Sequence, residues 1–256
     1  MQNRVESELT NPAGEPGNVE SIIEHLRGKE PEELIRFSFV NYGKKAAIGT
    51  SLQKTGVVII DLASKLGVDF RVYFVDTREN FPETYELVEE VEKKYGITIE
   101  RIYPDKKDIE QLEKQYGSYA HYFARSQCCR IKKDEPNKKM LNTLDVWIAG
   151  LRKDQSLHRA CHGEKVSIHR LNNRDILKIN PLFDWTQEKI DDYIKQNHVP
   201  YNKLYDIISD KGEKYTVIGC KSCHVPVLPH LSRRAGKFPW EDGYKECGLH
   251  IEGSGI

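Results

Sequence analysis

Apolar residues recur at helical spacing and in short runs from about residue 18 onward. The spacing between Asn18 and Gly28 predicts a helix, with Asn18 as its N-cap and Gly28 as its stop. A second helix is expected after Pro31, a residue that suits the first helical position. The segment Lys45 to Thr50 then predicts a buried strand, and the apolar run Val57 to Leu66 a helix. A strand, a turn and a helix form the first crossover unit of a parallel sheet.

The same alternation continues through the rest of the chain. Strands are expected at 70–76, 97–103, 146–150 and 176–179, and helices at 82–95, 108–142 and 185–196, the last capped near Asp184. This order predicts an α/β fold with a doubly wound, mainly parallel sheet. We expect a flexible lead-in over residues 1–17, one α/β domain over 18–232, and a mobile, glycine-containing tail over 233–256.

Charge and composition narrow the classes of partner. The 256 residues contain 39 Lys and Arg and 39 Asp and Glu, a balance that predicts no bulk binding to nucleic acid or to an anionic membrane. No signal sequence or membrane-spanning run is visible, so a cytoplasmic protein is expected. An anionic ligand would therefore have to be held by a local group of cations.

Four of the six cysteines fall into two pairs, Cys128 with Cys129 and Cys220 with Cys223. The Cys-x-x-Cys spacing of the second pair commonly offers two thiolates to one metal or cluster. Adjacent cysteines diverge on a helix or strand and bind a single ion only with strain, whereas a four-iron cube offers several separate irons. The pattern favours a [4Fe-4S] cluster, while zinc, a disulfide and inert buried thiols remain alternatives.

Polar and basic residues follow three of the predicted strands, near Ser51, Asp76 and Gly150. The turn from Gly49 to Gly56 has the small residues, hydroxyls and cation that suit a phosphate at a helix N-terminus, although it lacks the Walker pattern. Arg78 and Arg152 come after two of the strands, and guanidinium groups match phosphate or sulfate bidentately. We expect this edge of the sheet to bind a nucleotide with phosphate or sulfate groups. The alternative is that these charged residues are only solvent-exposed residues of surface loops.

A single cysteine, Cys247, lies near the C-terminus between Lys245 and His250. Positive charge nearby lowers the pKa of a thiol and favours the thiolate, so Cys247 is a candidate nucleophile. The alternative is an exposed cysteine without a role. The remaining cysteine, Cys161, is expected to have no role.

Four motifs in order resemble one enzyme family. They are Cys128-Cys129 with Lys133, Gly150-Leu-Arg-Lys-Asp-Gln-Ser156, Gly219-Cys-x-x-Cys223, and Glu246-Cys247-Gly-Leu-His250. Together they resemble the assimilatory adenylylsulfate (APS) reductases of the sulfonucleotide reductase family, over about Lys45 to His250. The resemblance implies an adenine nucleotide alpha-hydrolase-like fold with a C-terminal catalytic tail.

The resemblance also implies a reaction. Cys247 would attack the sulfate sulfur of APS, AMP would leave, and thioredoxin or a similar dithiol would release sulfite from the S-sulfocysteine. By the same resemblance, Cys128, Cys129, Cys220 and Cys223 would hold the [4Fe-4S] cluster. The implied substrate contacts are Ser51, Lys133, Gly150, Arg152, Arg159, Arg234 and Lys237.

Other functions remain as alternatives. Gln53 resembles the loop of 3′-phosphoadenylylsulfate (PAPS) reductases, and Lys237 stands where an Arg is common, so an iron-sulfur PAPS reductase is the first alternative. An ATP pyrophosphatase would need a Ser-Gly-Gly-x-Asp-Ser loop, which is missing between Ala46 and Val58. A non-enzymatic binding domain, in which the four paired cysteines bind zinc and stabilise the fold, would leave Cys247 without a role. The oligomeric state stays open, a homo-oligomer included.

Overall fold

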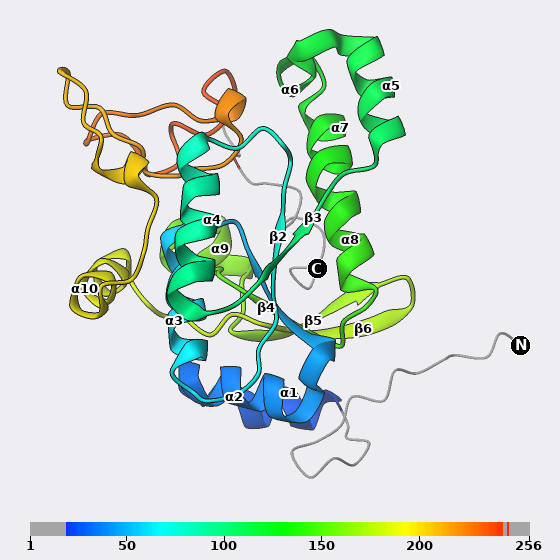
Figure 1. The fold of residues 1–256 in the computed structure, drawn as a ribbon. Coiled ribbons are helices and arrows are strands. Elements are labelled where there is room, and N and C mark those ends of the chain that lie inside the picture. The colour runs from blue at the N-terminus through cyan, green and yellow to red at the C-terminus, as the bar shows by residue number, and fades with distance from the viewer. Residues whose placement is uncertain (1–18, 243–244, 246–256) are drawn as a thin grey trace, which may run out of the picture.

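The computed structural model describes residues 19–242 and residue 245, in one sheet with helices on both sides (Figure 1). The strands are β1 (Ala46–Thr50), β2 (Val72–Val75), β3 (Ile99–Ile102), β4 (Val146–Ala149), β5 (Val166–Leu171) and β6 (Arg174–Ile179). The helices are α1 (Val19–Arg27), α2 (Pro31–Tyr42), α3 (Lys54–Ser64), α4 (Pro82–Tyr95), α5 (Lys106–Tyr116), α6 (Ala120–Phe123), α7 (Arg125–Cys129), α8 (Glu135–Leu141), α9 (Leu157–His162) and α10 (Gln187–Asn197).

The strand order is β3-β2-β1-β4-β6-β5, and every neighbouring pair is parallel except β5 with β6. From β1 the chain moves outward to β2 and β3, returns through α5 to α8, and enters β4 on the other side of β1. The direction of winding therefore reverses between β1 and β4. Open α/β sheets bind ligands at the carboxyl ends of the strands at such a reversal.

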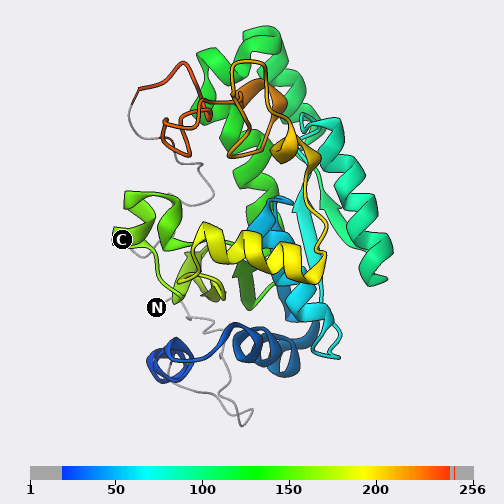
Figure 2. The ribbon, with the colours of Figure 1, turned by 90° about the vertical axis from the view of Figure 1, so that its left-hand side faces the viewer.

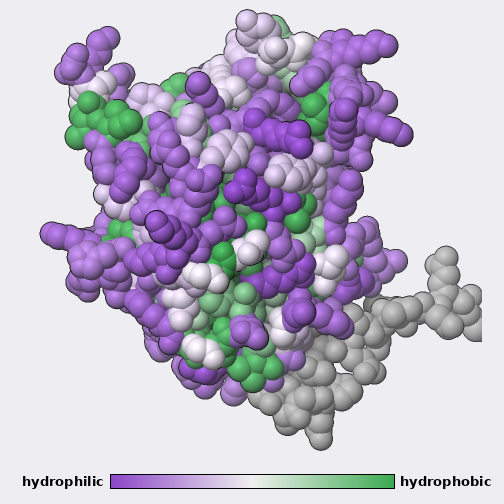
Figure 3. Space-filling model, in the orientation of Figure 1, coloured by the Kyte–Doolittle hydropathy of each residue, from purple (hydrophilic) through white to green (hydrophobic). Residues whose placement is uncertain are grey.

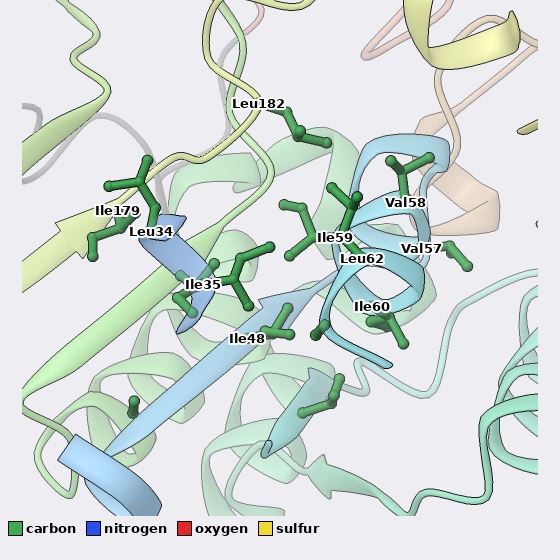
Figure 4. Packing of buried hydrophobic residues seen from close by; sticks show 14 of the residues in the cluster. Leu34, Ile35, Ile48, Val57, Val58, Ile59, Ile60, Leu62, Ile179 and Leu182 are labelled. Carbon is green, nitrogen blue, oxygen red and sulfur yellow. The ribbon is translucent and has the colours of Figure 1, made fainter. Parts of the chain in front are cut away.

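Strand side chains alternate between two hydrophobic layers. On β1, Ala46 and Ile48 belong to the larger layer, which contains residues of α1 to α4 and α10, whereas Ala47 packs with residues of α8 on the opposite face. Figure 4 shows Ile59 and Leu62 on the side of α3 that faces β1. Helices thus cover both faces of the sheet, and the predicted doubly wound α/β fold is confirmed.

Strand β5 was not predicted, because Ser167, His169 and Arg170 interrupt its apolar pattern. It pairs with β6 through a turn at Asn172 and Asn173, which both have positive φ, 50° and 62°. Asparagine tolerates this conformation, and such turns match the twist of a hairpin. The pairing makes β5 the antiparallel edge of an otherwise parallel sheet.

Helix boundaries differ from the predictions by a few residues. Helix α10 begins at Gln187, since the Thr186 hydroxyl accepts the Lys189 N–H, so the predicted cap near Asp184 is wrong by two residues. Helix α3 begins at Lys54 rather than Val57. This earlier start brings the amino end of α3 to the carboxyl edge of the sheet.

After α10 the chain is mostly irregular and returns to the carboxyl edge of the sheet. Isolated bridges join Asn80 to Cys220 and His224 to Lys237. In Figure 2 this segment, orange to red, lies beside the green helices that carry Cys128. The outer face in Figure 3 is mainly hydrophilic, with small separate hydrophobic areas. Within the described residues, every helix is too short or too polar to cross a bilayer.

Candidate active site

A cavity lies at the carboxyl edge of the sheet, where the winding reverses between β1 and β4. The loops after these strands, including Ser51 and Gly150, form part of its wall. Gly49 allows the side chains of Tyr73 and Trp147, which line the cavity, to pack directly against the backbone of β1. A Cβ at residue 49 would lie 2.6 Å from Tyr73 Oη and 2.7 Å from Trp147 Nε1. Only glycine fits this approach without movement of the two rings.

The amino end of α3 forms one side of the cavity. Its N-cap, Gln53, makes no side-chain hydrogen bond to the helix, and Ser51, Gln53 and Thr55 line the cavity. The first N–H groups of a helix have no partner within the helix and carry the positive end of its dipole. This side of the cavity therefore suits a hydrogen-bond acceptor of a ligand, such as a phosphate oxygen or an oxygen or nitrogen of a nucleoside.

The two cysteine pairs, distant in sequence, lie close together beside the part of the cavity that Thr77 lines. Cys129, Cys220 and Cys223 share one buried cluster with Phe238, and Cys128 lies within electrostatic range of Cys220. The second pair is fixed on the loop after β2, where Cys220 Sγ lies 3.3 Å from Thr77 Oγ1. All four are buried and free of disulfides.

The protein environment changes the acidity of these thiols. Burial raises the pKa of Cys128 to about 11. A hydrogen bond from Cys223 lowers the pKa of Cys220, and the same bond together with burial raises the pKa of Cys223. Of the two thiols, Cys220 therefore loses its proton first.

The four cysteines supply the number and kind of ligands that an iron-sulfur cluster uses. Within the described part of the chain, no three or more His, Cys, Asp or Glu side chains converge as ligands of one metal ion. The ligands of a four-iron cube bind separate irons, so they need not converge on one point. Cys129, Cys220 and Cys223 lie beside Phe238, and Cys128 is within electrostatic range of Cys220, so the four buried thiols match that requirement.

Cations gather between the cysteines and the cavity. Lys133, Arg234 and Lys237 line the cavity, and all three lie within electrostatic range of His224. Burial, followed by Lys133, lowers the pKa of His224 to about 3, so its imidazole is neutral near pH 7. His224 Nδ1 lies 3.0 Å from the Cys220 carbonyl oxygen. This end of the cavity, here called the cysteine end, thus presents three cations beside the thiols.

Six of the seven predicted substrate contacts line this cavity: Ser51, Lys133, Gly150, Arg159, Arg234 and Lys237. The seventh, Arg152, is fully buried behind the wall. Its guanidinium donates to Asp154 at 3.0 and 3.1 Å, to Gln187 at 2.9 Å and to the hydroxyl of Thr55. Arg152 therefore positions α3 and α10 rather than facing the cavity, and the roles of all seven stay predictions.

Replacing Arg152 with alanine is expected to lower the free energy of unfolding by about 1 to 3 kcal/mol, because the buried hydroxyl of Thr55 and the side chain of Gln187 would lose their hydrogen bonds to the guanidinium. Lys153→Ala is the matched control, since Lys153 forms an exposed ion pair with Asp184, of the kind worth about 0 to 1 kcal/mol. Denaturant unfolding of both variants measures the difference. Equal stabilities would contradict the structural role of Arg152.

Lys178 lies behind the cavity wall, 4.7 Å above the Trp147 ring and only 2% exposed. Burial, followed by the charge of Arg159, lowers its pKa from 10.5 to about 8. Between pH 8 and pH 10.5, Lys178 is protonated in the unfolded chain but largely neutral in the folded protein. The free energy of unfolding of the wild type should therefore rise with pH relative to that of Lys178→Met, by about 3 kcal/mol over this range. Urea unfolding at intervals from pH 7.5 to 10.5 tests this; a constant difference between the two proteins would contradict it.

Sequence reasoning missed several polar residues of the cavity, among them Asn137, Arg233 and His224. Arg233 was visible as the neighbour of Arg234, but the sequence contains no signal for which of two adjacent arginines faces a cavity. His224 follows Cys223 directly, so its position beside the thiols follows from theirs.

The candidate nucleophile Cys247 lies outside the described residues. Lys245, two positions earlier, is described, and its backbone oxygen accepts a hydrogen bond from Arg234 Nη2 at 2.8 Å. Lys245 Nζ donates in return to the Ala235 oxygen at 3.0 Å. Lys245 is thus held against Arg234 at the wall of the cavity.

Known proteins of similar fold agree with this architecture. A phosphoadenylyl-sulfate (PAPS) reductase from Candida auris, solved as a phosphate complex, matches with a TM-score of 0.67 and 27% identity, over 82% of this chain and 98% of that one. An FMN adenylyltransferase from Candida glabrata matches in fold alone, with a TM-score of 0.52, 16% identity, and 78% and 64% coverage. The predicted adenine nucleotide alpha-hydrolase-like fold is confirmed.

Sequence comparison identifies the family. An adenosine 5′-phosphosulfate reductase of Pseudomonas aeruginosa is 33% identical over 245 residues, covering 94% of this chain and 89% of the relative. Adenosine 5′-phosphosulfate reductase 2 of Bacillus subtilis is 36% identical over 221 residues, covering 86% and 89%. Residues 45–226 match the phosphoadenosine phosphosulfate reductase domain model. The chain belongs to the phosphoadenosine phosphosulfate reductase family.

Proposed function

We propose that the protein reduces adenylylsulfate (APS) to sulfite and AMP in sulfate assimilation, with thioredoxin or a similar dithiol as reductant. One observation carries the proposal: a cavity at the sheet reversal has three cations at the end where four buried thiols meet. The relatives named adenosine 5′-phosphosulfate reductase support the choice of substrate. A cytoplasmic location, with its thiol reductants, fits this chemistry.

The sulfonucleotide would lie with its adenosine toward α3 and its phosphosulfate toward the cysteine end. Lys133, Arg234 and Lys237 would hold the phosphosulfate oxygens through charge-assisted hydrogen bonds. The same contacts would stabilise the negative charge that develops on the leaving phosphate oxygen of AMP. Neutral His224 can donate or accept one hydrogen bond there without adding charge.

The covalent step would occur at Cys247. Its thiolate attacks the sulfate sulfur, the bond from sulfur to the bridging oxygen breaks, and AMP leaves with that electron pair. A dithiol then attacks Cys247 Sγ of the S-sulfocysteine, sulfite leaves, and the second thiol of the reductant restores Cys247. The dithiol supplies both electrons and becomes a disulfide, so the balance is complete. Residues 233–256 act in this proposal as the tail that delivers the nucleophile.

The proposed [4Fe-4S] cluster would be held by Cys128, Cys129, Cys220 and Cys223. When bound, it would supply local charge next to the phosphosulfate, and its irons would take up the thiolates that burial otherwise disfavours. No electron needs to pass through it, because the dithiol supplies both. Its contribution is therefore electrostatic and structural.

Sulfite release measured with APS and with PAPS in turn, each with thioredoxin, tests the function. We expect sulfite from APS only when enzyme and thioredoxin are both present. A product from PAPS alone would transfer the assignment to the PAPS reductases of the same family. Absence of sulfite from both substrates, with iron-loaded enzyme, would overturn the proposal.

A further inference from the structure

The two cysteine pairs lie on two segments of the chain that both contact a third. Cys128 and Cys129 belong to α7, whereas Cys220 and Cys223 belong to the irregular segment after α10. The third segment is the loop between β2 and α4, residues 76–81, here called the β2 loop. How the four thiols lie relative to one another therefore depends on the contacts of this loop.

Glu79 of the β2 loop contacts both cysteine segments. One carboxylate oxygen of Glu79 accepts a hydrogen bond from Lys132 Nζ, in the segment that follows the first cysteine pair. The other oxygen accepts from the hydroxyl of Ser222, in the second cysteine segment, at 3.4 Å. The backbone oxygen of Glu79 accepts from the N–H of Lys221 at 2.7 Å. The side chain of Glu79 thus connects the two segments.

The segment after the first cysteine pair is a π-helix, Arg130–Asp134, between α7 and α8, which Figure 1 labels. Such turns are rare and are often found at functional sites. Within this turn Lys132 is buried, with 9% of its side chain exposed, whereas Lys133 lines the cavity. Adjacent side chains of a helix point in different directions. A turn held through Lys132 and Glu79 therefore presents Lys133 to the cavity.

Other residues of the β2 loop hold the second cysteine pair. Thr77 Oγ1 lies 3.3 Å from Cys220 Sγ, and Asn80 forms an isolated bridge to Cys220. Glu79 adds the connection to the first pair, through Lys132. Together these contacts make the β2 loop the support on which the two cysteine segments meet.

The charge of Glu79 by itself disfavours iron ligands beside it. Glu79 and Lys132 both lie within electrostatic range of Cys128. A carboxylate repels the thiolates that bind iron, because like charges repel at short range. The position of Glu79 beside the thiols is therefore explained by the contacts that it makes and not by its charge.

We propose that Glu79 is a positioning residue, which joins the two cysteine segments and holds their four thiols in place for the cluster. This inference rests on the cluster of the proposed function, and it is independent of which sulfonucleotide is the substrate. Lys132 is the partner through which Glu79 acts on the first pair. Removal of either side chain leaves the other without its partner in a buried place, so the connection is lost.

The rate of iron release to a chelator tests the proposal without turnover. Glu79→Gln keeps the size of the side chain and removes its charge. It should release iron, and lose visible absorbance, about 10- to 100-fold faster than the wild type, the range found when a residue that supports metal ligands is changed. Lys132→Met should release iron faster to a similar extent. It tests the same contact from the other segment if Glu79→Gln does not fold.

The double variant, Glu79→Gln with Lys132→Met, shows whether the two side chains act together. Both changes break the same contact, so the double variant should release iron no faster than the faster single variant. If the two effects multiply instead, the residues act separately and the inference is overturned.

Glu100→Gln is the matched control for a general loss of stability. Glu100 of β3 forms an ion pair with Arg71, with 37% and 28% of the side chains exposed, whereas Glu79 is 33% exposed. This control should release iron at the wild-type rate. Equally fast release from Glu100→Gln and Glu79→Gln would assign the effect to loss of any ion pair and overturn the positioning role.

A second result would overturn the inference directly. If Glu79→Gln holds iron as well as the wild type or better, the carboxylate acts only by its repulsion of the thiolates. Failure of the proposed function would look different. Wild-type protein purified anaerobically without iron would remove the cluster and this inference with it, whereas absence of sulfite from both sulfonucleotides would remove the reaction, whatever the rates of iron release.

Discussion

Cys247→Ser is expected to abolish sulfite release, with a loss on the order of 10⁴-fold or more in kcat, the scale seen when a catalytic nucleophile is removed. A serine hydroxyl has a much higher pKa than a thiol and forms no S-sulfo intermediate. Nucleotide binding should survive, because the candidate contacts Lys133, Arg234 and Lys237 are untouched. The loss should therefore appear in turnover and not in affinity for AMP.

Intact mass provides the direct measurement. Wild-type enzyme incubated with APS and no reductant should gain about 80 Da, one SO3 group, since the intermediate accumulates when its second step lacks a dithiol. Peptide mapping should assign this mass to the peptide that contains Cys247, and thioredoxin should remove it. Cys161→Ser is the matched control, because Cys161 is an exposed free cysteine, and it should gain the same mass. Added mass on another cysteine, or turnover by Cys247→Ser, would show that the nucleophile is wrong.

Cys223→Ser is expected to lose iron and activity together. Cys223 is buried against Cys129, Cys220 and Phe238, so its loss removes one of the four thiols that would hold a cube. The freshly purified wild type should contain about four irons and four inorganic sulfides per chain and absorb visible light, whereas the variant should not. Without the cluster, the cysteine end should reorganise and sulfite release should fall by on the order of 100-fold or more.

Cys161→Ser is again the control for this experiment, because it removes a thiol that is exposed. It should keep its iron, its colour and its rate. If Cys223→Ser contains no iron and keeps full activity, the assignment of the cluster is wrong. Zinc in place of iron in the wild type would favour the alternative of a metal-stapled site.

The periodic pattern of apolar residues was sufficient to predict most of the fold. Runs such as Ala46–Thr50 and Val72–Val75 are apolar on both faces, which is typical of parallel strands covered by helices. The hairpin strand β5 was missed because Ser167, His169 and Arg170 give it no such run. Its formation depends on pairing with β6, a tertiary contact that local sequence does not contain.

Sequence by itself determined the order of most strands and helices, the two cysteine pairs and the presence of basic residues after the strands. These features follow from residue type and spacing. Only the tertiary structure decided which basic residues face the cavity. Arg152 and Arg233 have the same chemistry, yet Arg152 is enclosed by Asp154, Thr55 and Gln187 while Arg233 lines the cavity. The direction of a long side chain is set by the partners that the fold brings to it, and two of those partners, Thr55 of α3 and Gln187 of α10, are distant in sequence.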